Sequence, residues 1–397
     1  IIGGYHSSRT SNLFTFLSQL GLESEATIIG GHRKTSIQNA AMMNTISAQV
    51  LELNDTHSAL GVHPGQHTLP AALAVGEKVR STGKEVLASV IVGYDTMIRI
   101  GYALPVLKNQ WWAMNAAIGT FGAAASAGKI LDLDRKKMAC ALSIAGSRCF
   151  NILNVTSDVK DFSPGLSEWI GVMAASMARR GISGPDEILE TNHGFYDITC
   201  TSYDAEKVTA GLGSAFGIME TDFKPHASCR YTHSSIDACL EVAKKNRIDP
   251  NNLRRIVVKT YAKAVEATGQ PLSEKRRPRS VIDARFSMPY CVAIAAIFCQ
   301  VDPENVAERI NDPNVLDLAQ KVEVLSDPEF TKLYPTKLPA MIEIHALDDK
   351  TYTGRIDYPK GSSQNPMTEV EIQNRFKGFA SKLWNREHVD KILGIVH

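Results

Sequence analysis

The sequence predicts a mainly α-helical protein with a large all-helical domain and a smaller α+β domain. In residues 36–131, nearly every segment carries apolar residues at helical spacing. From residue 253 onward, stretches of β-branched residues alternate with polar ones, which is typical of strands. With 397 residues, the chain is also longer than one ordinary hydrophobic core requires. We therefore expect one large or two smaller domains.

The helices of the first domain follow one another closely. Residues 36–53, 69–82 and 84–104 each show helical periodicity, and Pro70 stands near the start of the second helix, where its missing N–H costs nothing. Residues 115–131 are rich in Gly and Ala, which lets neighbouring helices approach closely. We therefore expect this helix in the middle of a bundle.

Strands distinguish the second domain. Residues 253–262 form one β-branched stretch, and residues 340–359 read as two strands around "DDK", a hairpin. Helical patterns lie between these stretches, and the last helices of the chain are expected to return to the first bundle. The predicted domains are therefore 1–218, completed by 359–397, and 219–358.

Composition excludes several classes of function. The net charge is +1, so no global field would attract nucleic acid or a membrane. No run reaches the ~20 apolar residues that a membrane span needs. The seven cysteines are scattered without a CxxC pair, which favours free thiols and a cytoplasmic location. The chain begins at "IIGGYHSS" without Met, so we expect that an N-terminal piece is missing.

Two short runs invite a ligand-binding interpretation. The basic run "EKRRPRS" (274–280) is interpreted as a solvated loop, with a local anion contact as the alternative. The glycine run "GLGSAFG" (211–217) lacks the preceding strand and the downstream acidic residue of a dinucleotide fold. We interpret it as a flexible connection between the domains.

The stretch "ELNDTHSALGVHPGQHTLP" (52–70) brings together His57, His63 and His67. Their spacing matches no standard zinc pattern, and neither a cysteine nor a carboxylate pair accompanies them, so we predict no metal. Asp55 and its neighbours form turns and caps, and loops between buried helices often carry functional residues. We call this stretch the first loop.

Three more stretches hold candidate residues. "FKPHASCRYTHSSIDA" (223–238) crowds polar side chains ahead of an amphipathic helix near the expected domain junction, where a ligand cleft and a polar helix start are equally good interpretations. "ARFSMPY" (284–290) contains a tyrosine that could equally be a capped core residue. "SDVKDFSPGLSE" (157–168) contains Lys160, which sequence alone would place on the surface.

Together these stretches resemble the MmgE/PrpD family. The series "NDTHS…HPG…LPAALAVGE", "GTFGAAASAGKILDL", "GISGPDEILE", "FKPHASCRYTHSSIDA" and "RFSMPY" follows the order of the family's motifs over nearly the whole chain. The resemblance implies a helical domain with an α+β lid domain, assembled as a homodimer. It also implies enzymes without metal or organic cofactor that move a proton next to a carboxylate of a small di- or tricarboxylate.

The resemblance assigns roles to particular positions. It implies catalytic roles for four residues: His63, Lys160, Lys224 and Tyr290. Substrate-binding positions are Asp55, Thr56, His233, Arg285 and Ser287. Tyr102 and His57 are further candidates, although a core tyrosine and a structural histidine explain them as well. The lysines would neutralise substrate carboxylates, and a histidine or a lysine of lowered pKa would take the proton.

One departure from the family pattern decides the predicted reaction. Dehydratases and decarboxylases of the family carry a histidine where this chain has Ala113, after Trp112. Losing a general acid costs a factor of about 10²–10⁴ in rate. An epimerase resembling iminodisuccinate epimerase needs no acid for a leaving group, so the sequence favours this reaction. The alternatives are a 2-methylcitrate-type dehydratase or cis-aconitate-type decarboxylase, and a binding protein without catalysis.

Overall fold

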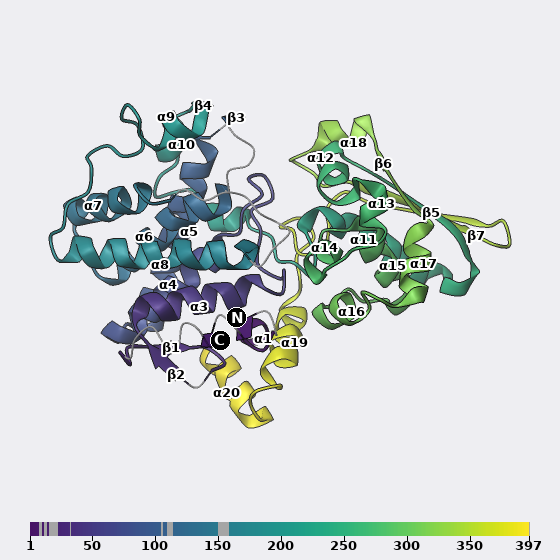
Figure 1. Cartoon of the computed structure of the whole chain (residues 1–397), viewed down its shortest axis with the longest axis horizontal. Helices are drawn as coiled ribbons and strands as arrows, with labels where there is room; N and C mark the ends of the chain where they lie inside the picture. The colour runs from purple at the N-terminus through teal and green to yellow at the C-terminus, as the bar shows by residue number, and fades with distance from the viewer. Residues whose placement is uncertain are drawn as a thin grey trace. The chain divides into compact units, whose positions relative to one another are not determined.

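The computed structural model confirms the predicted fold class. It describes residues 1–7, 10–11, 14–15, 23–31, 33–104, 106–108, 114–149 and 159–396. The chain divides into two compact units, which Figure 1 shows with the elements labelled. We call Ile1–Thr221 with Thr368–His397 the helical unit, and Asp222–Met367 the lid unit. The domain bounds expected from the sequence, 218/219 and 358/359, remain a prediction.

The helical unit is built from long helices with short additions. Its helices are α1 (Ile2–Tyr5), α3 (Ile37–Gln49), α4 (Pro64–Val79), α5 (Gly83–Tyr102), α6 (Met114–Ile130), α7 (Arg135–Gly146), α8 (Val159–Arg179), α9 (Phe195–Thr199), α10 (Glu206–Thr209), η1 (Gly217–Glu220), α19 (Glu369–Ala380) and α20 (Arg386–Val396). Two short antiparallel pairs accompany them: β1 (Ala26–Ile28) with β2 (Arg33–Thr35), and β3 (Val106–Leu107) with β4 (Cys200–Ser202). The last helices of the chain belong to this unit, as α19 packs against α1.

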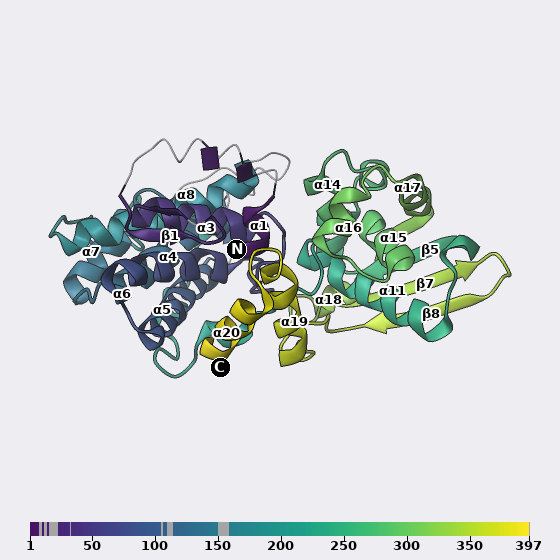
Figure 2. The same ribbon diagram turned by 90° about the horizontal axis from the view of Figure 1, so that it is seen from below.

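The Gly/Ala-rich helix α6 lies in the middle of the bundle, as predicted. It packs against α4, α5, α7 and α8, which Figure 2 labels in the same bundle. A methyl group added at Gly93 of α5 would lie 2.9 Å from the carbonyl oxygen of Gly122 of α6. The two helix backbones can therefore approach this closely only because both positions lack a side chain.

Helix α4 begins earlier than the sequence suggested. It starts at Pro64, so Pro70 lies inside the helix and not near its start. A proline inside a helix leaves the carbonyl four residues earlier without its usual N–H donor. Here the hydroxyl of Thr45 donates to that carbonyl, the oxygen of Gln66, at 3.0 Å. This contact from α3 satisfies the carbonyl, and the helix continues.

The lid unit combines a four-stranded sheet with short helices. Its strands, in the order β6-β5-β7-β8, are β6 (Val322–Ser326), β5 (Leu253–Thr260), β7 (Ala340–Ala346) and β8 (Thr351–Ile356). Only the β5–β6 pair is parallel. The helices are η2 (Arg230–Thr232), α11 (His233–Asn246), η3 (Pro250–Asn252), α12 (Ala262–Ala264), η4 (Val265–Gly269), α13 (Leu272–Lys275), α14 (Val281–Arg285), α15 (Met288–Phe298), α16 (Pro303–Glu308), α17 (Pro313–Gln320) and α18 (Pro328–Leu333).

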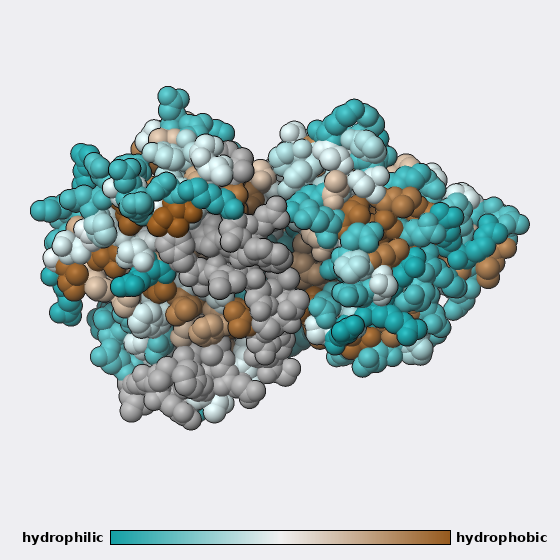
Figure 3. All heavy atoms as spheres, turned by 45° about the horizontal axis from the view of Figure 1, so that its top comes forward, coloured by the Kyte–Doolittle hydropathy of each residue, from teal (hydrophilic) through white to brown (hydrophobic). Residues whose placement is uncertain are grey.

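One face of this sheet is covered and the other is polar. Alternate residues of β5 and β7, such as Ile256, Val258, Ile342 and Ile344, are buried in a core to which α11 and α15 contribute. The residues between them point to the opposite face, because successive side chains of a strand alternate. The side of the lid unit seen in Figure 3 is mainly hydrophilic around a smaller apolar patch. The predicted hairpin is confirmed as β7 and β8.

None of the helices in the described part of the chain has the length and apolar character needed to cross a membrane.

Candidate active site

The first loop connects α3 to α4 and is shaped by its own polar groups. Its chain turns at Gly61, whose φ of 66° lies in the left-handed region that favours glycine, and His57 and Val62 pair as an isolated β-bridge. Both carboxylate oxygens of Asp55 accept from the backbone N–H of Gly65 at 3.1 Å. Asp55 therefore binds the first turn of α4, where a negative charge is favourable. The Tyr94 hydroxyl also donates to it, at 2.8 Å.

His63 is held in one tautomer. Its Nδ1 lies 2.7 Å from the backbone oxygen of Asp55 and 3.2 Å from the hydroxyl of Thr56. A carbonyl oxygen can only accept, so Nδ1 carries the proton of the neutral ring and Nε2 is its basic nitrogen. The His63 side chain is half-buried, and its backbone N–H donates to Oδ1 of Asn115 at 2.8 Å. The predicted residues Asp55, Thr56 and His63 therefore form one cluster.

A row of largely buried polar side chains is hydrogen-bonded to the backbone of His63 through Asn115. Asn115 Nδ2 and Gln66 Nε2 both lie 3.2 Å from Nε2 of His67. Amide NH₂ groups are donors, so this nitrogen accepts and the proton of His67 is on Nδ1. Burial lowers the pKa of His67 to about 3, so the ring stays neutral. Gln66 in turn accepts from Asn54, whose Nδ2 also donates to Gln49 at 2.8 Å.

His67 faces a buried carboxyl group. Its Nδ1 lies 3.9 Å from Oε2 of Glu168 in α8, and both side chains are fully buried. Burial raises the pKa of Glu168 well above its ordinary value. The other oxygen, Oε1, accepts from the backbone N–H of Ala71 at 2.7 Å. The third histidine of the first loop is therefore enclosed by buried protein groups, which favours a structural role.

Lys160 lies beside the first loop rather than on the open surface. It is at the start of α8, and its ammonium binds the carboxylate of Glu52. The Lys160 and Glu52 side chains are only 14% and 4% exposed. Gln49 also donates to Glu52, at 3.3 Å, which joins Lys160 to this row of polar side chains. Ala113 and residues 150–158 lie outside the described residues.

His57 and Tyr102 belong to a second cluster in the helical unit. Glu220 Oε2 accepts from Tyr102, and the buried His57 Nε2 lies 3.2 Å from the same oxygen. Burial, together with Glu220, raises the pKa of Tyr102. Tyr102 and Glu220 line a cavity of about 290 Å³ that also borders the glycine run at Gly217. No sequence pattern pointed to Glu220, because it is far from His57 along the chain.

The glycine run itself is bound by an arginine. Arg99 donates to the carbonyl oxygens of Ala210 at 2.6 Å and Ala215 at 2.8 Å. The carbonyls of this run therefore point at a cation. A phosphate loop would instead point backbone N–H groups at its ligand.

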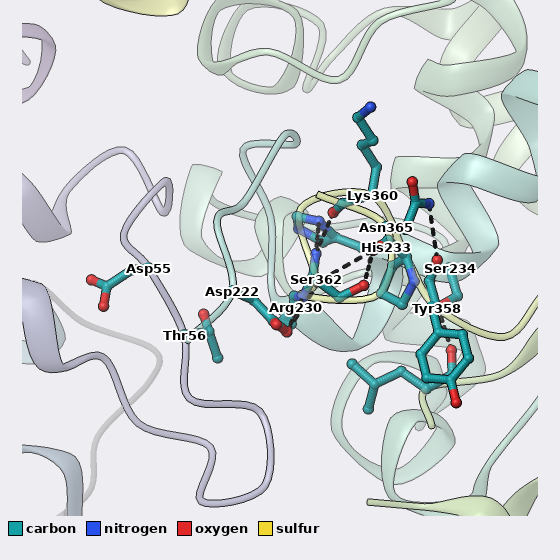
Figure 4. A network of polar contacts seen from close by, with 12 residues as sticks. Asp55, Thr56, Asp222, Arg230, His233, Ser234, Tyr358, Lys360, Ser362 and Asn365 are labelled. Carbon is teal, nitrogen blue, oxygen red and sulfur yellow. Dashed lines mark hydrogen bonds and ion pairs between the residues drawn. The ribbon is translucent and has the colours of Figure 1, made fainter. Parts of the chain in front are cut away.

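In the lid unit, Arg230 organises the stretch that precedes α11. Its guanidinium contacts Asp222 Oδ2 at 3.1 Å and the backbone oxygen of Lys360 at 2.9 Å. It also lies 3.2 Å from Nδ1 of His233, so that nitrogen is the acceptor. Figure 4 shows this guanidinium with its partners. The other nitrogen, Nε2, donates to the Ser228 carbonyl at 3.3 Å.

His233 is consequently not available as a base. It is fully buried, and each ring nitrogen has a protein partner. Burial, with the positive charges of Arg230 and Lys224 nearby, holds the pKa of His233 well below its ordinary value. Lys224 is itself 1% exposed. The burial of both side chains therefore favours a structural role for His233 near Lys224 and argues against direct contact of His233 with a substrate.

A histidine outside the predicted set shows the features of an acid–base group. His226 Nε2 lies 2.8 Å from Asp237 Oδ1, and the ring packs at 5.0 Å from the ring of His233. The backbone N–H of Lys360 donates to the other oxygen of Asp237 at 2.7 Å, which fixes the carboxylate. A carboxylate that accepts from Nε2–H leaves Nδ1 as the basic nitrogen. In the sequence, the only indication of this pair is that His226 and Asp237 begin and end the same short segment, "HASCRYTHSSID".

The stretch "ARFSMPY" has mainly structural contacts. The Ser287 hydroxyl caps α15 by accepting from the N–H of Tyr290 at 3.1 Å. Tyr290 is fully buried in the lid core, and its hydroxyl donates to the carbonyl of Val306 at 3.1 Å. The backbone oxygen of the buried Arg285 accepts from Cys229 at 2.9 Å. These contacts favour the interpretation of Tyr290 as a capped core residue, so we leave it out of the proposed catalytic set.

Within the described ranges, no group of three or more His, Cys, Asp and Glu side chains is placed to hold a metal ion. All seven cysteines, each in a described range, are free thiols.

The chain matches models of two protein-family domains. The MmgE/PrpD N-terminal domain matches residues 1–207, and the MmgE/PrpD C-terminal domain matches residues 226–397. Similar proteins include three cis-aconitate decarboxylases. That of Aspergillus terreus (strain NIH 2624 / FGSC A1156) is 26% identical over 393 residues, which cover 93% of this chain and 80% of the relative. Those of Mus musculus and Homo sapiens are 26% and 25% identical, covering 90% of this chain and 74% and 75% of the relative.

Proposed function

Because the chain belongs to the MmgE/PrpD family, we propose that it is a lyase that removes carbon dioxide from a small tricarboxylate of the cis-aconitate type. The similar proteins named above are cis-aconitate decarboxylases, and they align over most of this chain. This changes the order of the hypotheses drawn from the sequence. The epimerase, which the sequence favoured because of Ala113, has no support among these relatives, and the lyase alternative takes its place.

The observation that carries the proposal is the fixed tautomer of His63. Loss of carbon dioxide next to a C=C bond breaks a C–C bond, and its electron pair forms a new C=C bond. The old π pair then takes a proton at carbon, so one proton enters the product for each carbon dioxide released. Since Nδ1–H of His63 is held by the Asp55 carbonyl, Nε2 is the nitrogen that would carry this proton.

Lys160 is a cation of the helical unit that lies beside the first loop. We propose that Lys160 offsets a carboxylate that remains in the product, while Glu52 fixes the position of its ammonium. The neutral row formed by Asn115, Gln66 and His67 holds His63 without adding a competing charge. Preorganised groups of this kind lower the barrier because they need no rearrangement during the reaction.

The lid unit supplies a second set of residues for which we propose a role in the reaction. Lys224 is a buried cation, and His226 is oriented by Asp237. We propose that Lys224 contacts a substrate carboxylate and that His226 takes part in proton transfer. His226 would then supply an acid–base group in a chain that has Ala113 at the family's histidine position.

The direct test is to incubate the protein with cis-aconitate and to measure carbon dioxide release against substrate consumed. We expect one carbon dioxide for each molecule consumed and a five-carbon dicarboxylate as product. Citrate, which lacks the C=C bond, is the matched control substrate and should release none. Consumption of cis-aconitate without carbon dioxide, or no consumption at all, would overturn the proposal.

A further inference from the structure

A basic pocket lies on the polar side of the lid sheet. It has a volume of about 450 Å³ and is lined by Arg254, Arg255, Arg276, Lys321, Glu323 and His345, together with Gln320. Arg255 of β5 stands opposite His345 of β7 in the sheet register, and its chain neighbour Ile256 faces the core. The pocket therefore opens on the side of the sheet that the core helices leave uncovered.

The charges in this pocket do not balance. Four of the lining side chains are cations, and Glu323 is the one carboxylate among them. Arg255 contacts Glu323 at 2.9 Å, and Arg254 contacts Asp349 at 2.8 Å, in pairs that are substantially exposed. Arg276 and Lys321 form no ion pair with any of the residues that the structure describes. Two unit charges therefore remain uncompensated by a carboxylate.

Both of these cations are held in place by backbone oxygens. Arg276 donates from Nε at 3.0 Å and from Nη2 at 2.7 Å to the carbonyl of Val322. Lys321 donates from Nζ to the carbonyl of Leu253 at 3.0 Å. A carbonyl orients a cation without cancelling its charge, so less side-chain entropy is lost when an anion binds. The second edge of the Arg276 guanidinium, at Nη1, is not used by the Val322 carbonyl.

From these observations we propose that the basic pocket binds a small multivalent oxyanion that carries phosphate or carboxylate groups. A planar guanidinium and a lysine with fixed positions match the oxygen geometry of such groups. The volume falls in the range of small-molecule sites. The proposal also reassigns the run "EKRRPRS", which contains Arg276, from a solvated loop to an anion contact. It is independent of the proposed lyase function.

The competing explanation is a polar sheet face with ordinary solvated charges. In that case, an anion would be attracted by the net charge of the unit, and any two exposed lysines would contribute equally. In the basic pocket, by contrast, Arg276 and Lys321 should matter far more than other cations. A matched pair for comparison is Lys332 and Lys350, which lie on the same unit outside the pocket and contact Glu329 and Asp348.

The test is calorimetric titration of the whole chain with pyrophosphate and, separately, with citrate at low salt. The double variant Arg276→Gln/Lys321→Gln should weaken binding of at least one of these anions about 100-fold, because each lost charge-assisted hydrogen bond typically costs about tenfold. The control Lys332→Gln/Lys350→Gln should change binding less than twofold. Pyrophosphate binding alone would identify a phosphate ligand, and citrate binding alone a carboxylate ligand.

Two outcomes would overturn the proposal: equal losses in the two double variants, or no binding of either anion to the unchanged protein at millimolar concentration. Lys321→Gln alone serves as a second variant if Arg276→Gln disturbs β6, and it should still weaken binding about tenfold. Decarboxylation of cis-aconitate should stay within twofold in all of these variants. Calorimetry measures anion binding without turnover, so failure of the lyase proposal leaves the binding test intact.

Discussion

The first loop and the lid stretch before α11 use the same residue type in opposite ways. His63 is half-buried, and its Nδ1–H is held by the Asp55 carbonyl. His233 is fully buried, and Arg230 and the Ser228 carbonyl occupy both of its nitrogens. Burial and hydrogen-bond partners therefore separate the histidine that we propose as a proton carrier from one that is enclosed by the protein.

The largest expected effect tests His63. His63→Gln should lower kcat/KM for cis-aconitate by about 10²–10⁴, since it removes the proposed proton-transfer group. His193→Gln, at a 93% exposed position of the helical unit, should leave the rate within twofold. A His63→Gln enzyme with more than one tenth of the original activity would remove His63 from the mechanism.

A second variant tests the structural role assigned to the lid stretch. Arg230→Met should lower the free energy of unfolding by about 3–5 kcal/mol, because it removes the cation from a buried pair with Asp222. Arg254→Met, which breaks an exposed pair with Asp349, should cost about 0–1 kcal/mol. Urea denaturation measures both. Similar losses in the two variants would contradict the burial argument.

A third prediction concerns the pH dependence of stability that His67 causes. The pKa of His67 is about 3 in the folded chain against an ordinary 6.5, so only the unfolded chain takes up the proton between these values. The contribution is therefore fully present above pH 6.5 and decreases as the pH falls toward 3. Because of this histidine, the free energy of unfolding should fall by about 2 kcal/mol between pH 7 and pH 5.

His67→Gln should remove this part of the pH dependence, whatever its cost in absolute stability. His193→Gln should retain it, because that histidine is exposed. Denaturation curves at pH 7 and pH 5 give the difference for each protein. Parallel pH dependence in the His67→Gln and unchanged proteins would show that His67 is not buried as described.

A smaller effect is expected at the start of α15. Ser287→Ala should lower the free energy of unfolding by about 1 kcal/mol, because Ser287 caps this helix. The KM for cis-aconitate should not change if the role is only structural. Ser287→Thr retains a capping hydroxyl and serves as the control. A KM raised tenfold with unchanged stability would restore the role in substrate binding that the sequence suggested.

The smallest effect is expected at Ala113. If the lyase works with its present residues, Ala113→His should not raise kcat. A gain of tenfold or more would indicate that the unchanged protein is not a working decarboxylase and would favour the epimerase.

The sequence predicted those features that depend on residues close together along the chain. The Gly and Ala content of α6 placed it in the middle of the bundle, and the strand pattern identified β7 with β8 as a hairpin. Helical periodicity placed the start of α4 wrongly, because the partner that permits Pro70 inside the helix is Thr45 on another helix. Glu220 was missed for the same reason, since its contact with Tyr102 joins distant parts of the chain.

The candidate site was predictable as a set of motifs but not as a set of roles. The family resemblance named Asp55, Thr56 and His63, and the structure brings these three residues into contact within one loop. The sequence did not distinguish Tyr290 in the lid core from a tyrosine in a pocket, because both follow the same apolar helix pattern. Nor did it indicate that His226, rather than His233, has the carboxylate partner.

The most direct test of the proposed function is proton NMR of cis-aconitate incubated with the protein in D₂O. The lyase account predicts a five-carbon dicarboxylate that carries one deuterium on carbon for each carbon dioxide lost, with no deuterium in the remaining substrate. Deuterium that enters a six-carbon substrate without loss of carbon dioxide would contradict the account and would return the epimerase to first place.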